Sequence, residues 1–278
     1  MDHLPHDFKE RVCRLVPRKD LPRLGDLQDR DWSSLGLLHN VKRRDLYLSS
    51  ACETGSTSTK WGALNRSSHT DIKLPQIFDQ RFDQIRTLRT NYISNTPFEV
   101  DDDSLPQFLK YVWKFFTGKE LYLPQKIIEE AIVENDLVIQ FEEIMLTYHG
   151  QCSEAIFAAQ NMEKLRVCVL YDWPSNISQD LWTLIRNRNL EYLSLQDCEN
   201  HGFSEEMLKF YVEKSLEGDY YKERVSIHVS NVNFDCVEVL KPFCENKQVE
   251  VNSNSIAFKK AVGNLIVRYQ SNSLYIHW

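Results

Sequence analysis

The sequence predicts an α/β fold, with a small helical module at the N-terminus and a β-rich C-terminal end. From about residue 96, short apolar segments alternate with amphipathic helical segments, and this alternation favours a layered strand–helix architecture. Before residue 45 the apolar residues recur with helical periodicity. We therefore divide the chain into a helical module (1–45), a connecting segment (46–95) and a strand–helix region with a β C-terminal end (96–278).

Composition supports a folded chain. Of the 278 residues 42% are apolar and 26% are charged, which is ordinary for a globular protein with a sizeable core. The formal net charge of −7 argues against nonspecific nucleic-acid binding, which requires a basic surface. No stretch approaches the roughly 18 uncharged apolar residues that span a bilayer, and charged residues interrupt any signal peptide near the start. We expect an intracellular protein, cytoplasmic or nuclear, that binds neither nucleic acid nor membrane.

The cysteines predict neither a disulfide framework nor a metal site. Their number is odd and no C-x-x-C pair occurs, whereas metal sites and disulfide frameworks show tight or patterned spacing. A thiol inside an apolar run such as "LRVCVL" acts as a small hydrophobe. We expect reduced, structural side chains at Cys13, Cys52, Cys152, Cys168, Cys198, Cys236 and Cys244.

The first helical segment is amphipathic and short. Asp7 can cap it, Glu10 completes a capping-box pattern, and Pro17 marks its end. A second start follows at Asp20. The apolar face of this hairpin exceeds what its own core can bury, which indicates a partner. The apolar positions are Phe8, Val12, Leu15, Val16, Leu21, Leu24 and Leu27, with Trp32 closing the segment.

The order of these residues resembles an F-box, which begins with Leu-Pro, continues with an amphipathic helix and a Pro/Asp-Leu step, and ends in a leucine helix and a tryptophan. The resemblance covers about the first forty residues. It implies binding to the Skp-type adaptor of a cullin–RING ubiquitin ligase. The alternative is a helical hairpin packed on the rest of the chain. The implied adaptor contacts are Leu4, Pro5, Phe8, Val12, Leu15, Val16, Leu21 and Leu24.

The connecting segment begins with Leu46 and Leu48, which alternate as in a strand. Residues 49–71 are dense in Ser, Thr and Gly, a composition typical of a flexible loop or linker. We expect the boundary between modules in or near this loop.

A repeated pattern follows. "LEYLSLQDC" (residues 190–198) reads L-x-x-L-x-L-x-x-C and resembles a leucine-rich repeat. Degenerate copies place the middle position at 98, 121, 144, 165, 193 and 225, and all steps but the last lie in the range of about 20–29 residues of such repeats. Serine-capped helical segments lie between them. The alternatives are a leucine-rich-repeat-like solenoid, closed by C-terminal hairpins, and an ordinary α/β domain with evenly spaced elements.

The sequence predicts no catalytic residue, cofactor or metal site. It contains no G-x-S-x-G, H-E-x-x-H or G-x-G-x-x-G motif. Tyr171 and Trp173 follow an expected strand, where solenoid loops can contact ligands, and aromatic side chains are frequent at binding hot spots. They are the candidate target-binding residues, although such residues also pack over strand ends.

The leading interpretation is a non-enzymatic substrate-recognition subunit of a cullin–RING ligase, with the target bound by the repeats. Its general layout also resembles expanded nematode F-box-protein families. One alternative is a leucine-rich-repeat-like interaction scaffold or inhibitor without any ligase link. Another is an enzyme on a degenerate α/β fold, which the absence of motifs disfavours.

Overall fold

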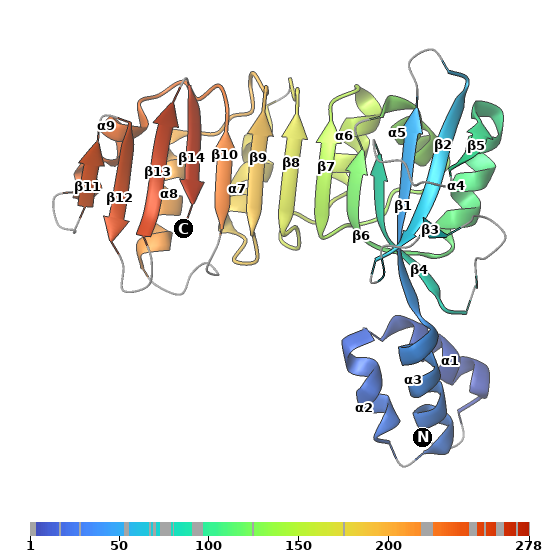
Figure 1. Cartoon of the computed structure of the whole chain (residues 1–278). Coiled ribbons are helices and arrows are strands. Elements are labelled where there is room, and N and C mark those ends of the chain that lie inside the picture. The colour runs from blue at the N-terminus through green and yellow to red at the C-terminus, as the bar shows by residue number, and fades with distance from the viewer. Residues whose placement is uncertain are drawn as a thin grey trace. The chain divides into compact units, whose positions relative to one another are not determined.

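The computed structural model (Figure 1) describes most of the chain. The described residues are 4–16, 18–27, 29–52, 56–66, 68, 71–72, 79, 81–90, 97–123, 125–174, 176–217, 225–244, 249–252, 254–259, 264–270 and 272–277. The fold is α/β, with helices and mixed sheets. The chain forms two compact units, residues 1–118 and 119–278, and strand β6 carries it from one into the other.

The first unit begins with helices and continues with a small sheet. Strand β1 pairs antiparallel with β2 and parallel with β4; β3 and β5 each pair antiparallel with β2. The elements are α1 (His6–Leu15), η1 (Arg18–Asp20), α2 (Leu21–Gly25), α3 (Arg30–Lys42), β1 (Arg44–Cys52), β2 (Ser58–Asn65), β3 (Asp71–Ile72), β4 (Asp83–Thr90), β5 (Phe98–Asp101), η2 (Asp102–Ser104) and α4 (Leu105–Trp113).

Helices α1 to α3 form a helical module with its own core. Cys13, Leu21, Trp32 and Leu35 are buried together at its centre. Arg43, at the end of α3, is also buried and donates hydrogen bonds of 2.5–2.6 Å to the carbonyls of Cys13, Arg14 and Val16. The guanidinium thus satisfies carbonyls that the C-terminus of α1 leaves without helical partners.

The interpretation of residues 49–71 as a flexible linker is wrong over much of its length. Strand β1 extends to Cys52, and β2 occupies Ser58–Asn65. Trp61 is fully buried and its ring packs against Phe108 at 4.9 Å. Serine and threonine here occupy positions on strands, at Ser49, Ser50, Ser58 and Thr59, and composition alone does not distinguish such strands from a loop.

The second unit alternates strands and helices, then ends in antiparallel strands. Figure 1 shows the helices of this unit on one face of its sheet. The elements are β6 (Phe116–Leu123), α5 (Lys126–Glu134), β7 (Glu143–Thr147), α6 (Gln151–Ala158), β8 (Val167–Tyr171), α7 (Ser178–Arg186), β9 (Tyr192–Gln196), α8 (Glu205–Leu216), β10 (Ser226–Val229), α9 (Cys236–Cys244), β11 (Val249–Asn252), β12 (Ser255–Lys259), β13 (Asn264–Gln270) and β14 (Ser273–His277).

Strands β6 to β10 are parallel, and each pairs with the next strand of the sequence. Their register aligns Leu121, Ile144, Cys168, Leu193 and Ile227 in one buried row. The steps along the chain are 23, 24, 25 and 34 residues. We call β6–β10 with their intervening helices the strand–helix array.

Three of the expected repeat positions need correction. Phe98 lies in β5, which pairs antiparallel with β2 and is outside the array. The middle positions expected at 165 and 225 belong at Cys168 and Ile227, which align with Leu193. Cys168 occupies the central position of β8, and a leucine pattern does not mark a cysteine, so the sequence pattern placed the register of this strand at Leu165.

The turns after the strands also repeat. Asp172, Asp197 and Asn231, each just beyond its strand, have positive φ angles of 56°, 56° and 59°. Asp and Asn tolerate this left-handed conformation better than other side chains do. A common turn therefore ends β8, β9 and β10 and aligns the loops that follow.

The strands expected at the C-terminal end are present. Strands β11 to β14 form an antiparallel meander, and β14 pairs antiparallel with β10. The meander therefore occupies the edge of the last parallel strand. Among the described residues, no helix has the length and apolar character needed to cross a membrane.

Candidate functional site

The helical module exposes an unusual share of large apolar side chains. Leu15 is 79% exposed and Phe8 47% on α1, while Val41 is 78% and Leu37 52% exposed on α3. Isolated exposed apolar residues are normal, but a concentration on one small module indicates an interaction surface. We call the exposed apolar residues of the module the apolar set: Leu4, Phe8, Leu15, Leu27, Leu37 and Val41.

The orientation of α1 depends on a buried lysine. The Nζ of Lys9 lies 3.0 Å from Asp29 Oδ2 and 3.2 Å from Asp31 Oδ2. Its hydrogen bond to Asp29 raises the pKa of Lys9, and the same bond lowers the pKa of Asp29. Asp29 also caps α3 by accepting from the backbone N–H groups of Asp31 and Trp32. The ion pair thus holds Lys9 inward, and Phe8 and Leu15 remain outside.

The structure separates the eight residues named for adaptor binding into three groups. Leu4, Pro5, Phe8 and Leu15 are exposed. Val12, Val16 and Leu24 are half-buried and pack against the core of the module, while Leu21 is fully buried within it. The side chain of Leu21 is therefore a core residue and is unavailable to a partner in this conformation. Leu27, Leu37 and Val41, which are also exposed, were not among these eight residues.

The sheet of the array has a second candidate surface, the face without helices. Its register places Tyr122, Met145, Val169, Ser194 and His228 in one row across β6 to β10. Tyr275 of β14 lies opposite His228, and the two rings stack 4.3 Å apart. We call this row the central row. Val169 and Ser194 are buried within it, whereas Tyr122, Met145 and His228 are half-buried; these last three are the side chains of the row that a polypeptide could contact.

A network of charges borders the central row at the start of the strands. Arg166 forms a two-point contact with Glu191, at 2.6 and 3.0 Å, and lies 3.7 Å from Glu142 and 3.8 Å from Glu143. Lys119 also pairs with Glu142. These ion pairs connect neighbouring strands. Their charges are used within the sheet and are not available to a ligand.

The two aromatic residues named for target binding have different environments. Tyr171 is half-buried at the end of β8. Trp173 is only 1% exposed, and its ring lies 5.3 Å from Tyr148 and 5.2 Å from Phe157. It occupies the inward position that Cys198 holds in the next repeat, so it packs in the core and does not face a target.

Buried polar groups in the array do not form a catalytic arrangement. Ser153 donates a 2.5 Å hydrogen bond to Glu129 and accepts one from the backbone N–H of His149. A catalytic serine also donates to a base, but its oxygen must be open to a substrate. Both Ser153 and Glu129 are fully buried. Among the described residues, no group of His, Cys, Asp and Glu side chains could hold a metal ion.

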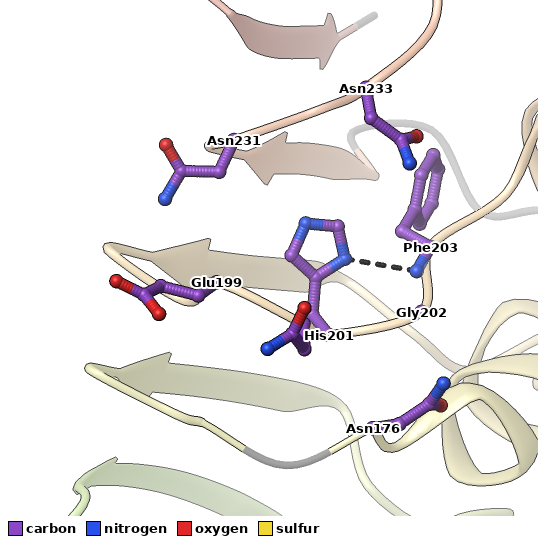
Figure 2. Close-up of a pocket in the computed structure, with 8 residues that line it drawn as sticks. Asn176, Glu199, His201, Gly202, Phe203, Asn231 and Asn233 are labelled. Carbon is purple, nitrogen blue, oxygen red and sulfur yellow. Dashed lines mark hydrogen bonds between the residues drawn. The ribbon is translucent and has the colours of Figure 1, made fainter.

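A polar cavity of about 230 Å³ lies among the loops after β8, β9 and β10 (Figure 2). In this view Glu199 and Asn231 lie on one side of His201, and Asn176 and Asn233 on the other. Sequence reasoning missed this cavity because each loop supplies only a few residues. We call it the loop pocket; it is lined by Asn176, Glu199, Asn200, His201, Gly202, Phe203, Asn231 and Asn233.

His201 is a structural part of the loop pocket. Its Nδ1 accepts from the backbone N–H of Phe203 at 2.9 Å, and its Nε2 lies 3.1 Å from the carbonyl oxygen of Ser230. The acceptor role of Nδ1 requires a neutral ring with the proton on Nε2. Burial lowers the pKa of His201, which favours the same neutral form. Both ring nitrogens are thus engaged by the backbone.

Comparisons with known proteins identify no family. No protein-family model matches the chain, and no curated protein matches it in sequence. Among solved structures it has a weak similarity to a MycE methyltransferase from the mycinamycin biosynthetic pathway, in complex with Mg and SAH. The sequences are 9% identical, the match covers 96% of this chain and 91% of that one, and the TM-score is 0.20. A TM-score this low does not indicate a common fold.

Proposed function

We propose that this chain is a substrate-recognition subunit of a cullin–RING ubiquitin ligase, with a helical F-box-like module and a leucine-rich-repeat-like solenoid. The module binds a Skp-type adaptor and the array binds a target protein. The chain itself breaks no bond. It acts by raising the effective concentration of the target near the transferring enzyme.

The apolar set is the observation on which the proposal rests. The helical module has a core of its own, and yet Phe8, Leu15, Leu37 and Val41 remain outside it. Covering such side chains with a partner contributes about 25 cal/mol for each Å² of apolar surface removed from water. The resemblance of the first forty residues to an F-box is the reason for proposing the adaptor as that partner.

The target-binding half of the proposal is supported by the geometry of the array. Parallel strands that follow one another in sequence, with helices on one face, leave the other face without helices, where a ligand can bind. Tyr122 and Tyr192 contribute half-buried aromatic side chains on this face. Aromatic residues are enriched in the centres of protein interfaces.

The adaptor contact is tested by capture of the full chain on an immobilised Skp-type adaptor. The test variant is Phe8→Asp with Leu15→Asp, because both side chains are exposed and neither belongs to the core cluster. Val16 is left unchanged because it packs against that core. We expect capture of the original chain and at least a tenfold loss in the double variant.

The matched control is Val251→Asp, which places a charge on an exposed apolar residue of β11. This variant should be captured as well as the original chain. Capture of the double variant at the original level, or no capture of the original chain, would overturn the adaptor assignment. An array that still binds a target without any adaptor contact would favour the interaction scaffold.

A further inference from the structure

The loop pocket has a charge that its ligand must match. Its lining residues belong to the sequence stretches 171–178, 196–204 and 230–235, and these stretches contain no Lys or Arg. They contain Asp172, Asp197, Glu199 and Asp235. His201 adds no positive charge, because its Nδ1 accepts a hydrogen bond. The electrostatic potential of this edge therefore attracts a cation and repels phosphates and carboxylates.

Its polar groups are already oriented. Asn231 donates its amide N–H to the carbonyl of Cys198, which leaves Oδ1 as an acceptor. Asn176 accepts from the backbone N–H of Ser178 through Oδ1, which leaves its amide nitrogen as a donor. Among the described residues, the carboxylate of Glu199 has no ion-pair partner. The Glu199 carboxylate and the Asn231 oxygen thus lie on one side of His201, and the Asn176 amide donor lies on the other (Figure 2).

The size of the pocket limits the ligand further. A volume of about 230 Å³ is below the range of about 300–1,000 Å³ typical of pockets for cofactors and drug-sized molecules. It suits a single long side chain together with part of a peptide backbone. A donor such as the Asn176 amide can serve a peptide carbonyl, while the acceptors serve a cation.

We propose that the loop pocket binds an arginine side chain presented by a partner polypeptide. The planar guanidinium offers five N–H donors and can meet the Glu199 carboxylate and the Asn231 oxygen together. This inference rests on the proposed target-binding role of the array, but it is independent of the adaptor contact.

The test is a titration of the isotope-labelled full chain with short capped peptides, followed by NMR. The probes are Gly-Gly-Arg-Gly-Gly and the same peptide with lysine, citrulline or glycine at the centre. Citrulline keeps the shape of arginine but is neutral. We expect shifts of the Gly202 and Phe203 amide resonances with the arginine peptide, at an affinity on the order of 1 mM, or about −4 kcal/mol. The lysine peptide should bind more weakly, and the citrulline and glycine peptides should not bind.

Two variants and a control assign the binding to the pocket. Glu199→Gln should lower the affinity for the arginine peptide at least tenfold. Asn233→Asp adds a carboxylate at the pocket and should raise that affinity about threefold to tenfold. The control Glu213→Gln removes an exposed charge from α8 and should change nothing. Glu199 is also exposed, so its replacement leaves the fold intact.

Three results would overturn the proposal. These are equal binding of the citrulline peptide, no change in Glu199→Gln, and shifts confined to residues away from the loops. Titration with Ca²⁺ or Mg²⁺ alone provides a further check: shifts of the same resonances, with loss of peptide binding, would identify a metal site instead. Loss of adaptor capture in the separate experiment leaves these peptide results unaffected, so the two proposals fail independently.

Discussion

The hydroxyl of Ser153 donates a 2.5 Å hydrogen bond to Oε2 of Glu129, and both side chains are fully buried in the array. Glu129 lies on α5 and Ser153 on α6. His149, in the loop between β7 and α6, approaches the other carboxylate oxygen to 3.3 Å. The carboxyl group therefore connects two successive units of the array. Its burial has a consequence for the dependence of stability on pH.

Replacement of Glu129 by glutamine should flatten that dependence. Burial raises the pKa of Glu129 above its ordinary value of 4.5, so the folded chain keeps a proton that the unfolded chain releases. Its contribution to stability is full below pH 4.5 and declines as the pH rises through the folded-state pKa. Urea unfolding midpoints from pH 4 to 8 should fall less steeply with rising pH in Glu129→Gln than in the original chain. The control is Glu130→Gln, on the exposed side of the same helix; equal pH slopes in all three chains would contradict the prediction.

Arg43 should be a major determinant of the stability of the helical module. Its guanidinium donates to three carbonyls near the end of α1, and hydrogen bonds with a charged group contribute about 1.5–3 kcal/mol each. Arg43→Met should lower the free energy of unfolding by at least about 3 kcal/mol and increase hydrogen exchange in residues 6–16. Arg43→Lys should have an intermediate effect because it offers fewer donors in a less fixed geometry. Arg11→Met, on the exposed face of α1, should leave exchange unchanged.

Alkylation should distinguish the cysteines by burial. Cys152 and Cys244 are half-buried, whereas Cys168, Cys198 and Cys236 are buried. Burial raises the pKa of Cys198 to about 11 and that of Cys236 to about 12, so few thiolates form at pH 8. Iodoacetamide at pH 8 should label the first two sites in the native chain and the other three only in urea. Peptide mapping by mass spectrometry measures this order, and native labelling of Cys168 at the rate of Cys244 would contradict it.

Gly202→Ala should deform the loop pocket, whereas Gly150→Ala should not. Both glycines have positive φ angles, 77° and 107°, so either substitution costs about 1–3 kcal/mol of backbone strain. An added Cβ at Gly202 would lie 2.5 Å from Asn176 Oδ1, while at Gly150 it meets nothing within 4 Å. The side-chain amide resonance of Asn176 should therefore shift in Gly202→Ala alone. An equal shift in both variants would indicate a general strain effect.

The sequence was informative wherever one face of an element is uniformly apolar. The strands around Ile144 and Leu193, and the hairpins after residue 249, follow directly from alternation. The first helix was predicted, but its inward face was assigned by hydrophobicity alone. Lys9 is buried there because Asp29 compensates its charge, and a periodicity analysis does not represent a contact between residues twenty positions apart.

Other features depend on contacts between distant segments. Helix α3 was not predicted: the hairpin was expected to close at Trp32, inside a helical module that extends to residue 45, whereas Asp29 caps a helix that contains Trp32. The loop pocket joins residues from three separate loops. The one indication of the pocket in the sequence is the absence of Lys and Arg from the stretches after β8, β9 and β10. This absence has a meaning only when the register of the strands is known, because the register shows that the three stretches lie at the same edge of the sheet.

The pairing of β14 with β10 determines how such a chain can change in length. β10 already has β9 on one side and the reversed β14 on the other, so a duplicated strand–helix segment has no place to add after it. A longer relative would have to gain its extra segments between β6 and β10, as internal insertions, and keep the terminal meander unchanged.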